Sequence, residues 1–201
     1  QGETVVFVAS ENEILGFISC VDQIKETSFF AVQELKKMGL DVILMTGDNL
    51  QSAQLVAQKT GIEKIFSKML PLHKAQEIKK IQNQGKKVLM AGDGINDAPA
   101  LTEAFLGVAM ATGSDIAIES ADFTLIQGNL IGLLTALKLA KKTFKKIKQN
   151  LFWAFFYNVV AIPLAFLGFL NPMIAGLAMA FSSVSVVSNS LSLKRFKAYK
   201  E

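Results

Sequence analysis

The sequence predicts an α/β fold followed by a hairpin of two membrane helices. Short apolar runs alternate with stretches of helical spacing over the first 135 of the 201 residues, an order typical of a parallel sheet flanked by helices. Residues 151–193 then contain no charged side chain, and this stretch is about twice the ~20 residues that a helix needs to cross a bilayer. The chain therefore has two regions of different chemistry.

The composition agrees with this division. Residues 1–122 carry a net charge of −5, whereas residues 123–201 carry +9. A hydrophobic share of 51% excludes an intrinsically disordered chain, and a single cysteine excludes a disulfide scaffold within the chain. The mean hydropathy of +0.36 is high for a soluble domain and too low for a wholly membrane-embedded chain.

The elements of the first region can be placed in order along the chain. The apolar runs predict strands at 5–9, 14–20, 42–45, 64–66, 88–91, 108–110 and 123–126. The helical stretches lie at 27–38, 49–59, 71–84, 96–104 and 114–120. The first three helices are expected to end at Gly39, Gly61 and Gly85. Folds of this class place their chemistry in the loops at the carboxyl ends of the strands.

The uncharged stretch is predicted to be a helical hairpin. The pair Asn171-Pro172 is a turn signal, which gives one helix at 151–170 and another at 172–193. A basic amphipathic stretch at 130–149 precedes the hairpin, and four basic residues follow it: Lys194, Arg195, Lys197 and Lys200. Because both open ends are basic, the positive-inside rule places both in the cytosol. A buried helical pair in a soluble protein is the alternative, but such pairs seldom lack charges for so long.

Two loops of the first region carry residues suited to phosphoryl chemistry. Thr46, Gly47 and Asp48 follow one predicted strand, and residues 92–97 (Gly-Asp-Gly-Ile-Asn-Asp) follow another. Each loop precedes a helix, where small residues and free backbone N–H groups bind anions. The hydroxyl group of Thr46 can also donate to a phosphoryl oxygen. Either loop alone is more often an ordinary turn with a helix cap.

Candidate ligands for Mg²⁺ and a candidate phosphate-binding lysine complete this set. Asp93, with Asn96 and Asp97 close behind, offers the oxygen atoms that Mg²⁺ prefers. Lys74 stands at the start of a predicted helix and can neutralise charge on the same phosphoryl group. Because phosphoryl transfer depends on positioning and charge compensation, the joint occurrence of these residues favours that reaction.

These runs resemble the phosphorylation domain of P-type ATPases, and the resemblance covers nearly the whole chain. The most specific run is 92–101 (GDGINDAPAL), and shorter ones lie at 22–25, 46–49 and 71–74. The resemblance implies a haloacid-dehalogenase-like, Rossmannoid fold with helices on both faces of a parallel sheet. It assigns Mg²⁺ binding to Asp93.

The same resemblance gives roles to the other residues of the two loops. It implies that Asn96 and Asp97 organise the second loop and that Thr46 and Lys74 contact the aspartyl phosphate. The full set of catalytic candidates is Thr46, Gly47, Asp48, Lys74, Asn96 and Asp97.

The predicted hairpin resembles the transmembrane metal site of copper(I)-transporting P-type ATPases. Tyr157-Asn158 in the first helix and 179–183 (MAFSS) in the second carry this resemblance. The implied Cu⁺ ligand set is Tyr157, Asn158, Met179, Ser182 and Ser183. The chemistry agrees, because Cu(I) is soft and accepts thioether sulfur. The hairpin also contains no Asp or Glu, the ligands that a divalent ion would call for.

The resemblance divides the chain into six parts. Residues 1–20 are expected to form the end of a nucleotide-binding domain and a return strand, and residues 21–135 the phosphorylation domain without its Asp-Lys-Thr-Gly-Thr segment. A basic cytosolic stalk is expected at 136–150, followed by two transmembrane helices at 151–170 and 171–193 and a cytosolic tail at 194–201. No aspartate of the chain is followed by Lys-Thr. We therefore expect the C-terminal part of a copper(I) export pump, inactive alone because the phosphorylated Asp is missing.

The resemblance also implies cofactors, partners and a location. Mg²⁺ and ATP are the expected cofactors, with ATP bound mainly by an upstream domain, and Cu⁺ is the transported ion. The expected partners are the remainder of the pump, membrane lipid and a copper chaperone, without nucleic acid. The chain would be a multi-pass membrane protein with its phosphorylation domain and C-terminus in the cytosol.

Two other functions remain open at this point. One is a non-catalytic membrane subunit, or a truncated pump product, that associates with a separate N-terminal half. The other is a stand-alone phosphatase of the haloacid-dehalogenase type, which the missing nucleophile disfavours.

Overall fold

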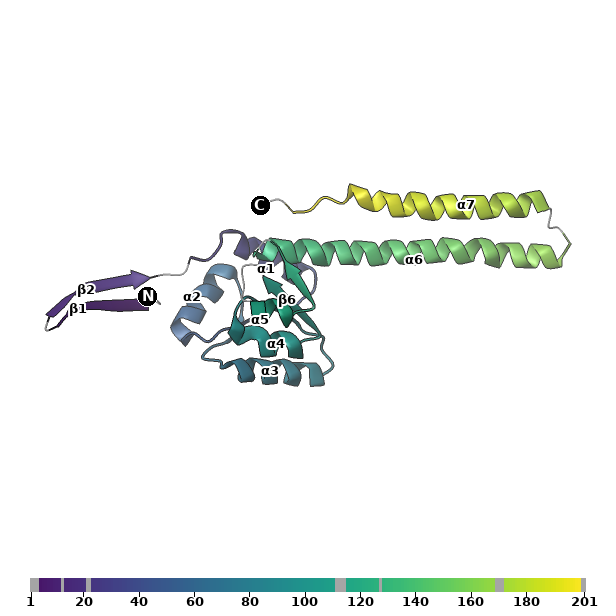
Figure 1. Ribbon diagram of the computed structural model, residues 1–201. Helices are drawn as coiled ribbons and strands as arrows, with labels where there is room; N and C mark the ends of the chain where they lie inside the picture. Colours follow the sequence, from purple (N-terminus) through teal and green to yellow (C-terminus); the bar gives the residue numbers. More distant parts are fainter. Residues whose placement is uncertain are drawn as a thin grey trace. The chain divides into compact units, whose positions relative to one another are not determined.

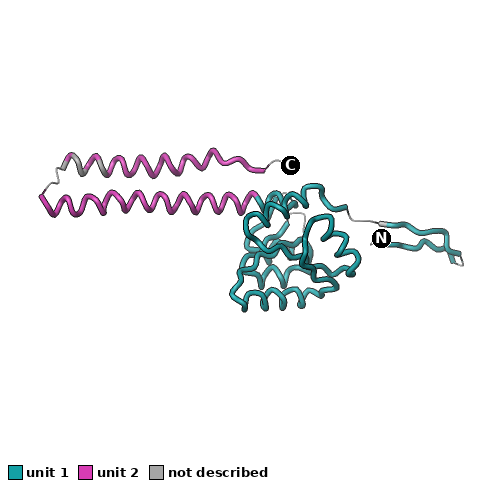
Figure 2. The backbone as a smooth tube through the Cα atoms, turned by 180° about the vertical axis from the view of Figure 1, so that it is seen from behind, with its two compact units in different colours: residues 1–134, 201 teal, residues 135–200 magenta. Residues whose placement is uncertain are grey.

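The computed structural model describes residues 4–11, 13–20, 23–110, 115–126, 128–168 and 172–199 (Figure 1). The chain divides into two compact units, of which unit 1 ends at Leu134 and unit 2 begins at Thr135 (Figure 2).

Unit 1 alternates strands with helices, as the sequence predicts. Its strands are β1 (Thr4–Ser10), β2 (Glu13–Cys20), β3 (Ile43–Met45), β4 (Lys64–Phe66), β5 (Leu89–Gly92), β6 (Leu106–Met110) and β7 (Phe123–Leu125). Its helices are α1 (Thr27–Lys37), α2 (Leu50–Thr60), α3 (Pro71–Asn83), α4 (Ala98–Glu103) and α5 (Asp115–Glu119), with a 3₁₀ turn, η1 (Ile95–Asp97), before α4. Each predicted strand and helix of this region is present within two residues of its expected ends, and the α/β class is confirmed.

The parallel strands of unit 1 form two sheets. β3 pairs with β4 in one sheet, and β5, β6 and β7 pair in that order in the other. β1 and β2 form a separate antiparallel hairpin. β3 and β5 are therefore sheet edges, each pairing with one neighbour among the described strands. A sheet edge presents backbone N–H and C=O groups that can pair with a further strand.

Local sequence explains where α2 begins and ends and where α3 begins. The side chain of Asn49 accepts a hydrogen bond of 2.9 Å from the N–H of Ser52, which caps the start of α2. Gly61 ends α2 with φ of 73°, a left-handed conformation that glycine adopts without strain. Pro71 begins α3, where its missing N–H leaves no hydrogen bond unmade.

The core of unit 1 lies between its helices and the three-stranded sheet. Its largest fully buried side chains are Ile78, Leu101, Leu134, Val32 and Val108. α3 and α4 lie side by side (Figure 1), and β6 approaches α4 so closely that a Cβ atom at Gly107 would lie 2.6 Å from the carbonyl oxygen of Leu101. The position needs glycine, because a side chain there would push α4 from the sheet.

Unit 2 consists of two long helices. α6 (Leu130–Phe166) begins in unit 1 and α7 (Pro172–Leu191) is followed by a 3₁₀ turn, η2 (Ser192–Arg195). α6 has 37 residues and is long and apolar enough to cross a membrane. The side chains of α7 include no charged group.

The basic stretch and the first predicted membrane helix form one helix in the structure. They are continuous because no glycine or proline lies in α6 between Gly132, in its first turn, and Pro163. α6 also ends at Phe166, four residues before the expected end at 170. The N–H of Leu167 donates to the oxygen of Pro163 at 3.0 Å, and Gly168 adopts φ of 77°, which stops the helix. The predicted turn at Asn171 lies outside the described residues.

Burial in α3 provides a test of the unit 1 core. Changing Ile78 to alanine removes a side chain that is 0% exposed, so the free energy of unfolding should fall by about 2–4 kcal/mol. The matched change Leu72→Ala, at a position 67% exposed on the same helix, should alter it by less than about 1 kcal/mol. Urea denaturation followed by circular dichroism measures both, and equal losses would contradict this account of the core.

Candidate phosphoryl-transfer and metal sites

The loop after β3 brings Thr46 and Asp48 together. The hydroxyl group of Thr46 donates to Oδ2 of Asp48 at 2.7 Å, and the N–H of Asp48 donates back to that hydroxyl at 3.1 Å. Backbone hydrogen bonds hold the loop against residues 66–69, with Thr46 N–H donating to Phe66 O at 2.9 Å and Lys68 N–H donating to Asp48 O at 2.8 Å. The loop is therefore tied by its own polar groups. A Cβ atom at Gly47 would lie 3.5 Å from the oxygen of Met69, an ordinary van der Waals distance, so space alone does not require glycine there.

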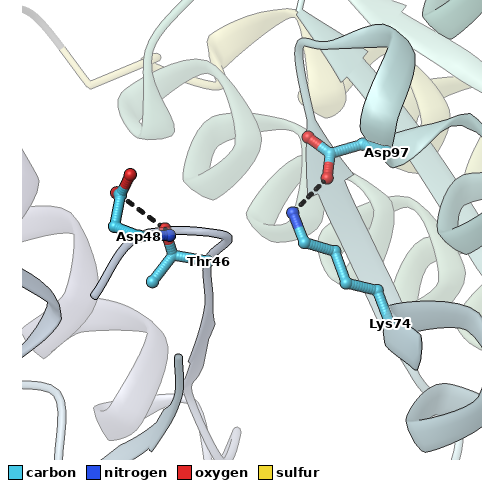
Figure 3. Close-up of polar contacts among 4 residues, drawn as sticks. All are labelled: Thr46, Asp48, Lys74 and Asp97. Carbon is cyan, nitrogen blue, oxygen red and sulfur yellow. Dashed lines mark hydrogen bonds and ion pairs between the residues drawn. The ribbon is translucent and has the colours of Figure 1, made fainter. Parts of the chain in front are cut away.

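A second pair joins α3 to the loop after β5. Nζ of Lys74 lies 2.7 Å from Oδ1 of Asp97, and the two side chains are only 9% and 14% exposed (Figure 3). A charge that is removed from water is costly unless a partner compensates it. Each side chain provides that partner for the other. The sequence interpretation placed Lys74 towards a phosphoryl group and did not foresee this ion pair.

Gly92 gives Asp97 the room that this pair requires. A Cβ atom at Gly92 would lie 2.7 Å from Cβ and 2.8 Å from Oδ2 of Asp97, distances too short for atoms that are not bonded. The last residue of β5 must therefore be glycine if Asp97 is to reach Lys74. The N–H of Asp97 also donates to the oxygen of Gly94 at 2.9 Å, which fixes the turn of the loop.

Asp93 and Asn96 lie in the same loop and are exposed. They follow β5 at its carboxyl end, as the sequence predicts. No group of three or more His, Cys, Asp or Glu side chains suited to a metal lies among the residues that the structure describes. An exposed carboxylate and an amide in one loop still fit Mg²⁺, because this ion binds one or two carboxylates and completes its shell with water and phosphate oxygens.

The structure thus gathers the catalytic candidates into two pairs and one exposed loop. Thr46 and Asp48 form the first pair and Lys74 and Asp97 the second (Figure 3). Each pair places a hydrogen-bond donor against a carboxylate. Such donors can also bind the oxygens of a phosphoryl group, which carry the same charge.

The five candidate ligands of the membrane region lie on two helices. Tyr157 and Asn158 are on α6, while Met179, Ser182 and Ser183 are on α7. Two of them form hydrogen bonds within their own helices. Asn158 Nδ2 donates to Ala154 O at 2.8 Å, and Ser183 Oγ donates to Met179 O at 3.1 Å. The side chain of Met179 is 71% exposed, so its sulfur is accessible to a ligand or a neighbouring helix.

The buried ion pair can be tested by removing one partner. Changing Lys74 to methionine leaves the carboxylate of Asp97 buried and unpaired, which should lower the free energy of unfolding by about 3 kcal/mol. The exposed pair Lys80–Glu77 on the same helix, at 3.4 Å, provides the control, because Lys80→Met should cost less than about 1 kcal/mol. Urea denaturation measures both values. A Lys74→Met protein as stable as the control would show that the pair contributes nothing.

Comparisons with known proteins agree on the family. A family model described as a haloacid dehalogenase-like hydrolase matches residues 1–104. The chain is 53% identical over 196 residues to the probable copper-importing P-type ATPase A of Enterococcus hirae, covering 96% of this chain and 27% of that protein. It is 52% identical over 197 residues to the copper-exporting P-type ATPase of Bacillus subtilis, covering 98% of this chain and 25% of that protein.

A solved structure of similar fold supports the same assignment. The crystal structure of a zinc-transporting PIB-type ATPase in the E2.Pi state matches with a TM-score of 0.84 and 35% sequence identity, over 96% of this chain and 32% of that one. The chain spans about a quarter of the length of the curated relatives that it matches. Nearly its whole length is similar to a part of heavy-metal P-type ATPases, and the chain belongs to the haloacid dehalogenase-like hydrolases.

Proposed function

We propose that this chain forms the phosphate-handling and ion-binding part of an ATP-driven copper(I) export pump. The observation that carries the proposal is that one α/β unit contains two donor–carboxylate pairs, Thr46–Asp48 and Lys74–Asp97. The chain of this unit continues into a helix that is long and apolar enough to cross a membrane. A phosphatase of the same fold would not need that helix.

The phosphorylated carboxylate is proposed to come from another segment of the pump. Covalent phosphoryl transfer needs a nucleophile, and no aspartate of the chain stands in the Asp-Lys-Thr sequence that the family phosphorylates. The edges of β3 and β5 support this proposal, because each has backbone groups that can pair with an incoming strand. The loops that follow these two strands contain Thr46 and Asp93, so a strand between them would end near both.

Each candidate residue then has a defined part in the reaction. The hydroxyl of Thr46 and the ammonium group of Lys74 would exchange their carboxylate partners for phosphoryl oxygens and so offset the charge of the transition state. Asp97 would hold the side chain of Lys74 in place between turnovers. Asp93 would hold Mg²⁺, with Asn96 beside it, and the ion would neutralise charge on the phosphate oxygens. ATP itself would be bound mainly by the upstream domain.

The membrane part is proposed to bind the transported ion. Met179, Ser182 and Ser183 lie at i, i+3 and i+4 of α7 and share one face of that helix. A thioether sulfur is a soft ligand that suits Cu(I). Tyr157 and Asn158 of α6 would complete the site, together with ligands from the remainder of the pump. This placement puts unit 1 and the C-terminus in the cytosol, where a copper chaperone would deliver the ion.

Copper is favoured over zinc by the donor set. One structural relative is described as zinc-transporting, whereas the curated relatives are named for copper. The described residues of α7 and of α6 beyond Asn150 include no carboxylate and no imidazole, the groups that commonly bind Zn²⁺ alongside cysteine.

The relatives are named both as importers and as exporters. Export is therefore proposed on the family resemblance and needs a transport assay in oriented vesicles.

A non-catalytic subunit that associates with a separate N-terminal half is the second candidate. It is favoured by the same open strand edges of β3 and β5, which a separate chain can also fill. Purification of this chain from its host distinguishes the two. Recovery within one long polypeptide supports a single pump, and recovery of a separate chain carrying Asp-Lys-Thr supports the two-chain arrangement.

The Mg²⁺ assignment predicts the behaviour of an Asp93 variant. In the complete pump, Asp93→Asn should reduce phosphoenzyme formation from radiolabelled ATP by at least about 100-fold, because the ion would lose its carboxylate ligand. The control Asp41→Asn changes an exposed carboxylate paired with Lys86 and should leave the phosphoenzyme level unchanged. Normal phosphorylation of the Asp93 variant would overturn the assignment.

The copper assignment predicts a selective effect at Met179. Replacing it by alanine should raise the Cu(I) concentration for half-maximal ATPase stimulation by about tenfold or more, because the thioether ligand is lost. Met173→Ala, on the first turn of the same helix, provides a control with the same change of side chain. Identical Cu(I) activation of the two variants would remove Met179 from the proposed site.

A further inference from the structure

α6 carries two separate stripes of lysine residues before its apolar part begins. The inner stripe consists of Lys138, Lys142 and Lys146, which recur every four residues. The outer stripe consists of Lys141, Lys145 and Lys148, at i, i+4 and i+7. Residues at these spacings share one face of a helix. The two stripes run side by side along α6, because Lys138 and Lys141, like Lys142 and Lys145, are three residues apart.

The three lysines of the inner stripe contact α7 and the segment that follows it. Nζ of Lys138 lies 4.2 Å from the ring centroid of Tyr199 and bonds its hydroxyl group. Lys142 lies 5.4 Å from the ring of Phe196. Nζ of Lys146 donates to Oδ1 of Asn189 at 2.6 Å. Aromatic faces and an amide oxygen therefore solvate these three charges within unit 2.

The Lys146 contact is part of a longer polar chain. Nδ2 of Asn189 donates to Oδ1 of Asn150 at 2.7 Å, and Nδ2 of Asn150 donates to Oγ of Ser190 at 2.8 Å. These bonds fix α6 against α7 and determine which face of α6 is turned away from α7.

The described residues of unit 2 offer the outer stripe no carboxylate to balance its charge. Lys141, Lys145 and Lys148 are exposed, and the only ring contact given by these three side chains in the described residues is that of Lys148 with Phe144, at 4.9 Å. The described residues from 128 to 199 include no Asp or Glu. Three positive charges thus stand along about two turns of the helix with no acidic residue of unit 2 to neutralise them.

A shallow apolar groove begins where the outer stripe ends. Lys148 borders it, and its other lining residues are Leu151, Phe152, Phe155, Phe156 and Val159. A ligand that fits both features needs an anionic group for the lysines and an apolar chain for the groove. An anionic phospholipid has a phosphate that attracts lysine and acyl chains that exclude water.

We propose that the outer stripe and this groove bind an anionic phospholipid of the cytosolic leaflet. Its phosphate lies among Lys141, Lys145 and Lys148, and an acyl chain follows the groove from Leu151 towards Val159. The proposal rests on the membrane placement of α6 in the proposed function. Charge complementarity selects the anionic lipid. Its net negative charge offsets part of the positive charge of the three lysines, whereas a zwitterionic headgroup brings a cation of its own that they repel.

The test measures lipid binding directly in the complete pump. The purified protein in detergent is titrated with phosphatidylglycerol or phosphatidylcholine, and bound lipid is counted by native mass spectrometry. Replacing Lys141, Lys145 and Lys148 together by glutamine should weaken phosphatidylglycerol binding by at least about tenfold, since each lysine near an anionic headgroup contributes roughly fivefold. Replacing all three by arginine, which keeps the charge, should preserve the binding.

A matched triple variant controls for net charge. Lys59, Lys79 and Lys80 are exposed residues of unit 1, and changing all three to glutamine should leave phosphatidylglycerol binding unchanged. Equal affinity of the outer-stripe glutamine variant and the unchanged pump would overturn the proposal, as would equal binding of the two lipids. A third result would also overturn it. If the three lysines resist chemical acetylation in the lipid-free pump, another segment of the pump covers them and no lipid can reach them.

The readout is independent of copper and ATP. A pump that binds phosphatidylglycerol through these lysines but does not transport copper would contradict the proposed function and leave this inference standing. A pump that transports copper and binds both lipids equally would contradict this inference alone.

Discussion

The buried ion pair between Lys74 and Asp97 is the contact on which the candidate phosphate site depends. It joins α3 to the loop after β5, and its two residues are 23 positions apart in the chain. The pair exists because Gly92 leaves space for Asp97 and because Pro71 begins α3 where Lys74 can reach that space. Two desolvated charges at 2.7 Å hold each other in one geometry, and a preorganised donor of this kind is what phosphoryl transfer uses.

Most of the fold of unit 1 follows from local sequence signals. The spacing of apolar residues, the helix-capping residues and the glycine positions predict its strands and helices. These signals are local, because they depend only on residues a few positions apart in the chain. The division of the parallel strands into two sheets could not be predicted in this way. Pairing between β3, β5 and their neighbours depends on contacts far apart in sequence. Continuity of α6 across residue 150 was also missed, because a change from basic to apolar side chains marks a change of environment rather than a helix end.

The site was predictable as a set of residues and less so as a geometry. The runs around Thr46 and Asp93 identify the two loops, yet they do not reveal that the donors pair with Asp48 and Asp97. A lysine at the start of a helix has no local signal for burial. In unit 2 the sequence shows the spacing of the lysines. The contacts of Asn189 in α7 and of Tyr199 in the segment after it decide which lysines these parts of the chain meet.

The central claim is that this chain organises a phosphoryl transfer whose acceptor carboxylate belongs to another segment. The most direct measurement is to phosphorylate the complete pump with ATP, trap the acyl phosphate at low pH, and locate the modified residue by peptide mass spectrometry. The account predicts a phosphorylated aspartate outside the 201 residues of this chain. A phosphorylated aspartate within them would contradict it.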